Sequence, residues 1–588
     1  MCLRVQVQFG PLTEYRAATM FVEDLRTQFY QRLIGKRILV IVNYDIDAIC
    51  ASKILQALFK YDNMLYSIVP IMGIMGMVRA FNENKDDVKF VLLVNCGGCI
   101  DLVDLLQPEP DVVFFVCDSH RPYDICNVYS DQQICILGEM NPDEGIPDFD
   151  TCFQDSEDED DDDDDDAVDN SDEDDEEGGG GAGASRERNR IERIERQLLK
   201  RRQRREWEEK RNQKLFDYTQ FSYYGSSSAL NIFELAWHLS KDSIDLLWWA
   251  IVGVTEQLLL GKIDSAAYTF FTEKMRPHVS RLTNKATDQA IQTSVKILFE
   301  NDLHLALYRH WSVLDSLKYS IYPACKMKLW TYKGEKVMHE LLVDMGLPLV
   351  QAKQTFNAMD LVLRKEFHDK MEKFADKFHL PEIVYGSFVL QYGYRNKYSA
   401  ADYVYSMLAI LESVKKDRTP ETCFLQSMDA LSRSNKEILD EGIEICKTLL
   451  STIFKQVQSS LEMHAVYSAG PFLYFILQEE IPFFTCPYGL IMLARFLLNG
   501  HVAVSRNRRA RELPLIAVAP IDLARGVSLL VGIPPVCEES KSLFGKAFDQ
   551  AAKKSGSTIS QDFFETSVIQ IRQSDCTKFL DAMTVLLS

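Results

Sequence analysis

Short apolar runs alternate with stretches of helical spacing between residues 37 and 138 of this 588-residue chain. Residues 37–43 read RILVIVN, residues 90–95 read FVLLVN and residues 112–117 read VVFFVC. Runs that are apolar on both faces are typical of strands in a parallel sheet that helices cover on each side. Ligands of such sheets lie at the carboxyl ends of the strands. The sequence therefore predicts an α/β domain whose functional residues follow its strands.

Polar residues do follow three of these predicted strands. They form the segments Asn43-Tyr44-Asp45-Ile46-Asp47-Ala48, Asn95-Cys96-Gly97 and Asp118-Ser119-His120. The spacing Asp45-x-Asp47 puts two carboxylates on one turn, where their oxygens could hold a cation such as Mg²⁺ or Mn²⁺. Two such ions about 4 Å apart clamp the attacking and leaving oxygens of a phosphodiester. An isolated Asp-x-Asp is often a helix cap or a surface pair, but three strand-end segments together predict a phosphoesterase-type metal centre.

The order of these segments resembles the DHH phosphoesterase superfamily, which includes the RecJ exonucleases. The superfamily motif His-x-Asp-x-Asp-Gly corresponds to residues 43–48, and its Asp-His-His motif corresponds to residues 118–120. Asn95 stands where the superfamily has an Asp, and Glu256 of Gly253-Val254-Thr255-Glu256 stands where an Asp is usual. We find no counterpart of the Gly-Gly-His substrate loop.

Asn43, Asn95 and Ser119 thus have neutral side chains where the superfamily has ionisable ligands. With fewer negative charges, the centre would compensate the charge of two dications much less well. The resemblance implies an impaired metal centre with no catalytic residue and no expected metal, although one weakly bound divalent ion is compatible with it. The centre comprises Asp45, Asp47, Asn95, Asp118, Ser119, His120 and Glu256. A further interpretation is that Asn95 and Ser119 donate hydrogen bonds to the buried carboxylates in place of ions.

A narrower resemblance covers nearly the whole chain from Met20 onward. Segments similar to the cell division control protein 45 family include FFVCDSHRP at 114–122, RRQRREWE at 201–208, SSALNIFELAWHLSKD at 227–242 and LLWWAIVGVTEQ at 246–257. The resemblance implies a non-catalytic scaffold subunit of the eukaryotic replicative helicase. It would join the hexameric MCM ring, the GINS tetramer and other replisome and loading factors on nuclear chromatin, and could contact single-stranded DNA. A manganese-dependent exonuclease or phosphodiesterase is the alternative.

We expect an α/β fold with a DHH-type parallel-sheet domain, a helical insertion and a smaller α/β C-terminal domain. Residues 1–19 are predicted to be a flexible extension, and 20–270 the DHH-like domain. That domain is interrupted by a disordered acidic and Gly-rich linker at 154–185 and a charged helix at 186–214. Residues 271–382 are predicted to form a helical partner-binding insertion, including a helix over 286–300. Residues 383–588 are predicted to form a domain like the DHHA1 module of the superfamily.

Charge is distributed unevenly along the chain. Eighteen Asp and Glu residues between 155 and 177 account for most of the net charge of −21, so the remainder is close to neutral. The cluster Lys200, Arg201, Arg202, Arg204 and Arg205 is interpreted as a nuclear import signal, and a solvated charged helix is equally compatible with it.

A second basic cluster, Arg506, Arg508, Arg509 and Arg511, precedes a predicted strand and could contact DNA phosphates. An exposed loop without a partner is the plainer interpretation. The apolar run at 246–254 is too short to cross a bilayer, so we predict no membrane partner.

Overall fold

The computed structural model describes residues 20–130, 133–153, 182–287, 295–393, 396–414, 418–536 and 540–588. The described residues form two compact units. The smaller unit contains those between 141 and 220, and the larger unit contains those of 20–140 and 221–588. The predicted extension at 1–19 and residues 154–181 of the predicted linker lie outside the described residues. Among the helices that the structure describes, none combines the length and apolar character that a membrane span requires.

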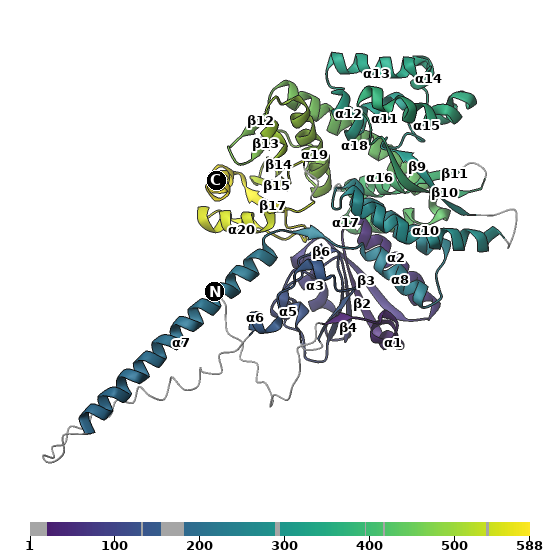
Figure 1. Cartoon of the computed structure of the whole chain (residues 1–588). Helices are drawn as coiled ribbons and strands as arrows, with labels where there is room; N and C mark the ends of the chain where they lie inside the picture. The colour runs from purple at the N-terminus through teal and green to yellow at the C-terminus, as the bar shows by residue number, and fades with distance from the viewer. Residues whose placement is uncertain are drawn as a thin grey trace. The chain divides into compact units, whose positions relative to one another are not determined.

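The larger unit begins with a six-stranded sheet, three of whose strands (β2, β3 and β4) are labelled in Figure 1. The strand order is β1-β7-β5-β4-β2-β3. Every neighbouring pair of strands in it is parallel, as predicted. The strands are β1 (Phe21–Val22), β2 (Arg37–Asn43), β3 (Leu65–Ile71), β4 (Phe90–Val94), β5 (Val113–Cys117) and β7 (Ile134–Leu137). Because the strands share one direction, their carboxyl ends lie at the same edge of the sheet.

Helices cover both faces of this sheet. Val40 and Leu92 point into a core shared with α2 (Ile46–Tyr61), α8 (Ser228–His238) and α9 (Ile244–Leu259). Leu39 and Leu93, their neighbours in the strands, point into a second core with α3 (Ile74–Asn84) and α4 (Leu102–Leu106). Side chains alternate between the two faces of a strand, so burial on both faces requires the wholly apolar runs seen in the sequence.

A three-stranded antiparallel sheet follows, in the order β11-β10-β9. It comprises β9 (Lys296–Leu303), β10 (Val384–Tyr392) and β11 (Asn396–Ser399). The predicted helix over 286–300 is therefore wrong, because α10 (Ser265–Thr287) ends at residue 287 and β9 occupies residues 296–300. A short apolar run fits a strand or a helix equally well by periodicity, and here pairing with β10 decides. Phe299 lies opposite Phe388 in this pairing, with their rings 5.1 Å apart.

Between β9 and β10 the chain is helical, as predicted for the insertion. Its helices are α11 (Val313–Tyr319), α12 (Ile321–Met327), α13 (Tyr332–Asp344), α14 (Leu349–Ala352) and α15 (Leu361–Ala375). Four further helices follow β11: α16 (Ala400–Leu411), α17 (Pro420–Ala430), α18 (Lys436–Glu462) and α19 (Pro487–Val504). Because β9 and β10 pair across the predicted boundary at residue 382, the limits of the insertion stay a prediction.

The C-terminal part contains a six-stranded mixed sheet in the order β12-β13-β14-β15-β17-β16. Its strands are β12 (Val466–Ser468), β13 (Leu473–Ile476), β14 (Leu515–Asp522), β15 (Val527–Ile533), β16 (Ile559–Ser560) and β17 (Val568–Arg572). The helices α20 (Phe544–Ser555) and α21 (Cys576–Leu587) pack on one face, where Phe544, Phe548 and Phe579 are buried. The mixed α/β character predicted for this part is confirmed.

The smaller unit is dominated by the 38-residue helix α7 (Ala182–Thr219), with the short α6 (Phe149–Phe153). The predicted charged helix is confirmed, and ion pairs with i, i+4 spacing join Arg202 to Glu206 and Arg204 to Glu208. Residues 182–185, predicted to belong to the disordered linker, are instead helical. Extending an existing helix costs far less free energy than starting one, and the segment contains two alanines, the residue with the best helix propensity.

Candidate functional site

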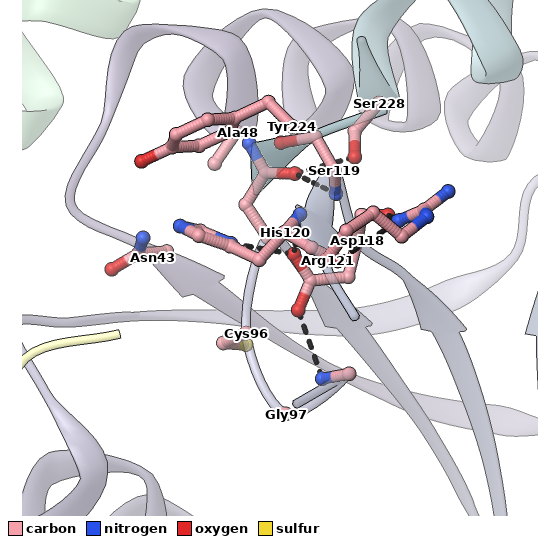
Figure 2. Close-up of polar contacts among 12 residues, drawn as sticks. Asn43, Ala48, Cys96, Gly97, Asp118, Ser119, His120, Arg121, Tyr224 and Ser228 are labelled. Atoms are coloured by element: carbon pink, nitrogen blue, oxygen red, sulfur yellow. Dashed lines mark hydrogen bonds and ion pairs between the residues drawn. The ribbon is translucent and has the colours of Figure 1, made fainter. Parts of the chain in front are cut away.

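The three strand-end segments meet at the carboxyl edge of the parallel sheet. They follow β2, β4 and β5, which are neighbours in the sheet. Figure 2 shows Asp118, Ser119, His120 and Arg121 together there, with Asn43 and Cys96 from the adjoining segments and Ser228 from the start of α8. Asp45, Asp47, Asn95, Asp118 and Ser119 are each at most 2% exposed, and Glu256 is fully buried. The structure therefore brings the residues of the predicted centre into one buried cluster, the carboxylate centre.

Asn95 links two aspartates of the carboxylate centre. Its amide nitrogen Nδ2 donates hydrogen bonds to Asp45 Oδ1 and to Asp47 Oδ2, each over 3.1 Å. Its amide oxygen accepts from the backbone N–H of Ser119 over 3.2 Å and from the hydroxyl of Ser228. Asn95 has φ of 51°, a left-handed conformation that Asn adopts more readily than most residues. An amide in this position does what an ion or a carboxylate alone cannot, since it donates to one pair of groups and accepts from another.

Asp45 and Asp47 are also held by helix N-termini. Asp45 caps α2, where Oδ1 accepts from the N–H of Ala48 over 2.7 Å and Oδ2 accepts from Asn43 Nδ2 over 2.8 Å. Asp47 is in the first turn of α2 and faces the N-terminus of α8. There it accepts from the backbone N–H groups of Ser228 over 2.8 Å and Ala229 over 3.0 Å. The hydroxyl of Ser227 donates to Asp47 as well. Helix N-termini carry partial positive charge and stabilise such carboxylates.

Asp118 and His120 form a separate pair. The His120 ring nitrogen Nδ1 lies 2.7 Å from Asp118 Oδ1, and the N–H of Gly98 donates to Asp118 Oδ2 over 2.8 Å. Burial alone would raise the pKa of Asp118, but the charge of His120 and these hydrogen bonds hold it below its usual value. Burial opposes protonation of His120, yet the Asp118 charge raises the pKa of the imidazole overall.

Glu256 has a buried partner that the sequence analysis missed. Lys262 Nζ lies 2.7 Å from Glu256 Oε1, with the side chains 9% and 0% exposed. Burial raises the pKa of Glu256 to about 7, although the charge of Lys262 opposes that rise. Burial would lower the pKa of Lys262, but the charges of Glu256 and Asp45 raise it overall.

The turn that ends α9 directs Lys262 back towards Glu256. Gly261 has φ of 66°, its N–H donates to Leu258 O over 3.0 Å, and the N–H of Lys262 donates to Gln257 O over 2.8 Å. These two bonds define a Schellman C-cap, in which the residue after the glycine returns along the helix. The glycine at 261 was the available signal, since it predicts such a turn with Lys262 immediately after it.

Two other contributors were missed and one prediction fails. Ser227 and Ser228 supply hydroxyl donors, and their signal was a serine run directly before the apolar-periodic stretch of α8. Asn95 donates to the carboxylates as one interpretation expected. Within the described part of the chain, the hydroxyl of Ser119 makes no hydrogen bond to them, and Ser119 contributes its backbone N–H instead. That N–H points to the Asn95 oxygen because Ser119 lies at the strand end beside it.

The residues present do not fit the pair of dications that the DHH resemblance implies. Hard cations need several oxygen lone pairs directed at one point. Here the oxygens of Asp45, Asp47 and Asp118 all accept hydrogen bonds from N–H or O–H groups. A metal site needs three or more ligand atoms close together. Within the described part of the chain, such a group of acidic, His or Cys ligand atoms, all within 4.8 Å of one another, occurs at Asp101, Asp124 and Cys126 and does not occur at the carboxylate centre.

A small cavity adjoins Asp118 and His120. Its volume is about 180 Å³, and its lining includes Phe563, Phe564 and Thr566 from the C-terminal part. The same segment is fixed to α3, because Asp562 accepts from the N–H groups of Ile74 and Met75, each over 2.7 Å. Pockets for organic ligands measure roughly 300–1,000 Å³, so this cavity is smaller than a nucleotide requires.

The two basic clusters lie outside the carboxylate centre. Arg506, Arg508, Arg509 and Arg511 are exposed at the turn between α19 and β14. Arg202, Arg204 and Arg205 are exposed on α7, which also contains Lys200 and Arg201. DNA contact by the first cluster and nuclear import by the second stay predictions.

Comparison with known proteins gives the following matches. The family model described as CDC45 matches residues 38–586. The human cell division control protein 45 homolog is 41% identical over 578 residues, covering 97% of this chain and 100% of the human protein. The Schizosaccharomyces pombe homolog is 27% identical and covers 94% of this chain and 96% of its own. A crystal structure of CDC45 from Entamoeba histolytica aligns with a TM-score of 0.69 at 22% identity, over 96% of this chain and 98% of that one.

Proposed function

Because the chain belongs to the CDC45 family, we propose that it is a non-catalytic scaffold subunit of the eukaryotic replicative helicase. Membership makes the chain a replication factor. The finer proposal is that it joins an MCM ring and a GINS tetramer on chromatin during origin activation and fork progression. Near-complete coverage of the human homolog supports this proposal, because the parts that an assembly would contact are present in one chain.

The observation that carries the non-catalytic part is the internal hydrogen bonding of Asp45 and Asp47. A hydrolytic centre needs metal-directed oxygens and an ion-activated water. Here Asn95, Ser227, Ser228 and the start of α8 occupy the positions around these oxygens. We therefore expect the chain to bind no tightly held metal and to cleave no phosphodiester.

The helical insertion is the proposed partner-binding element. Val343 on α13, Val350 on α14 and Val362 on α15 are 75%, 72% and 59% exposed. Three helices of the insertion thus each expose a large apolar side chain, and this is the basis for placing a partner here. Figure 1 shows these helices grouped beyond the three-stranded sheet. Binding of the ring or the tetramer there is our proposal.

Contact with single-stranded DNA is proposed at the exposed arginines before β14 and not in the small cavity beside His120. A strand backbone binds through its phosphates, and four exposed guanidinium groups supply the matching charge. Nuclear localisation is proposed to depend on the basic cluster of α7, where Arg202, Arg204 and Arg205 are exposed and accessible to an import receptor.

Co-purification tests the assembly proposal. Full-length chain recovered from nuclear extract should bring down a hexameric helicase ring and a four-subunit complex in fixed stoichiometry. A variant with Val343, Val350 and Val362 changed to Ser should lose one of them, whereas the exposed Val585→Ser on α21 serves as a matched control. Recovery of the chain alone from extract in which the ring is intact would contradict the proposal.

A manganese-dependent nuclease is the second candidate, favoured by one observation. Asp118 and His120 both line the cavity, so an acidic residue and an imidazole still face open space. Incubation with labelled single-stranded DNA and manganese decides between the two. No cleavage is expected from the parent chain. Cleavage that disappears in Asp45→Ala would establish the nuclease instead.

A further inference from the structure

A lysine ammonium is enclosed beside the carboxylate centre. Lys262 Nζ lies 2.7 Å from Glu256 Oε1 and faces the rings of Tyr224, 5.0 Å from its centroid, and Tyr488, 5.8 Å from its centroid. An acid on one side and aromatic faces on others form a cation site. The Schellman turn at Gly261 places Lys262 in this site, so the cation is a side chain of the protein and not a bound ion.

The other carboxylates of the centre already have partners of their own. Asp118 pairs with His120, and Asp47 lies on the N-terminus of α8. Asp45 caps the N-terminus of α2 and accepts from Asn43 and Asn95. Glu256 is fully buried, and Lys262 is the cation beside it. Buried anions are costly unless a positive charge or several donors compensate them.

We propose that the Lys262 ammonium is a tethered counterion that takes the place of a metal ion in a DHH-type centre, balancing the buried charge of Glu256. The inference deepens the proposed loss of hydrolysis and rests on it. An ammonium supplies charge and donors but has no site at which water can coordinate, so it preserves the fold of the centre without its chemistry. A covalently tethered cation is also always present, whereas a metal must be acquired.

The counterion role of Lys262 makes a prediction that a purely local ion pair between Lys262 and Glu256 does not make. If Lys262 only satisfied Glu256, its neutral replacement would weaken the fold and nothing more. If it takes the place of an ion, its removal should leave the buried Glu256 carboxylate without a cation, and a divalent cation can then bind there. The informative variant is Lys262→Met, which keeps most of the side-chain length and removes the charge.

Thermal unfolding of the full chain in EDTA and in manganese tests this role. We expect the same melting temperature for the parent under both conditions. K262M should melt several degrees lower in EDTA and recover part of that loss in manganese, and calorimetry should detect manganese binding only to K262M. Lys241→Met is the matched control, because Lys241 pairs with Asp62 at 18% and 23% exposure in the same part of the fold. Its melting temperature should not respond to manganese.

Each contrary outcome has a defined meaning. The inference fails if the parent is stabilised by manganese or destabilised by EDTA, or if K262M melts like the parent in EDTA. It also fails if K262M folds neither with nor without manganese while Lys262→Arg, which keeps the charge, folds normally. Manganese binding by the parent without DNA cleavage contradicts only this inference. Binding accompanied by cleavage contradicts the proposed function as well.

Discussion

Asn95 Nδ2 donates to Asp47 Oδ2 over 3.1 Å at a position where the DHH resemblance expects an Asp. An Asp in that place would face Asp47 as a second anion and would need a cation between them. The amide instead supplies a donor to each of two carboxylates, so one change of side chain converts the requirement for an ion into internal hydrogen bonds. The stability of the centre should therefore depend on Asn95.

Asn95→Ala should lower the free energy of unfolding by about 2–4 kcal/mol, because two buried carboxylates each lose a donor. Chemical denaturation of the full chain measures this loss. Asn84→Ala is the control, since the Asn84 side-chain amide at the end of α3 donates to the backbone oxygen of Ala80 and to no carboxylate within the described residues. If Asn95→Ala unfolds like the control, the hydrogen bonds described above do not stabilise the centre.

Gly253→Ala tests how closely α9 packs on the carboxylate centre. A Cβ at this position would lie 2.6 Å from Asp47 Oδ1 and 2.8 Å from Ala229 Cβ. Both neighbours are buried, so the clash should lower stability by about 1–3 kcal/mol despite the better helix propensity of Ala.

Gly76→Ala in α3 is the matched control for this substitution. Its added Cβ would meet Ile71 Cβ at 3.4 Å, an ordinary contact, and the change should be neutral or stabilising. Equal melting temperatures for Gly253→Ala and the parent would show that α9 can move away from Asp47 at no cost.

Glu412 should make stability depend on pH. Burial raises the pKa of this side chain to about 8, although the N–H of Gly489 donates to it over 2.9 Å. The folded state then keeps a proton that the unfolded state, with a pKa near 4.5, releases. Stability from this group is thus lost as pH rises from about 4.5 to about 8, by an amount on the order of a few kcal/mol.

Glu412→Gln should remove that loss, since a neutral amide does not titrate. Urea midpoints at about pH 5 and about pH 9 should diverge for the parent and differ less for the variant. Glu421→Gln, an exposed position at the start of α17, should retain the pH dependence of the parent. A variant whose midpoints change with pH as much as those of the parent would assign the effect to other groups.

Changing Arg506, Arg508, Arg509 and Arg511 to Ala should weaken binding of single-stranded DNA and flatten its salt dependence. Each phosphate that a protein neutralises on a single strand contributes about 0.7 to the slope of log affinity against log salt. Fluorescence anisotropy over a salt series measures the slope. The comparison variant changes Arg202, Arg204 and Arg205 on α7, and a larger effect there would place the DNA contact on that helix instead.

Part of the fold could be predicted because local patterns decide it. The runs at residues 37–43, 90–95 and 112–117 are apolar on both faces, and burial on both faces of a parallel sheet is the environment that such runs fit. Parallel pairing then places Asn43, Asn95 and Asp118 at one edge whatever the details of packing. The strand β9 could not be predicted, because its pairing partner β10 lies about 90 residues further along the chain and only that pairing separates strand from helix.

The carboxylate centre, like the fold, could be predicted only in part from the sequence. The sequence by itself determines which carboxylates and which neutral replacements follow the strands, since side-chain chemistry and strand order are local properties. Only the tertiary structure decides what faces those carboxylates. Ser227 and Ser228 arrive with α8, and Lys262 arrives through a turn at the end of α9, both from more than 100 residues after the strands. Hydrogen bonds and ion pairs depend on separations of a few ångströms, and packing alone sets those separations between distant segments.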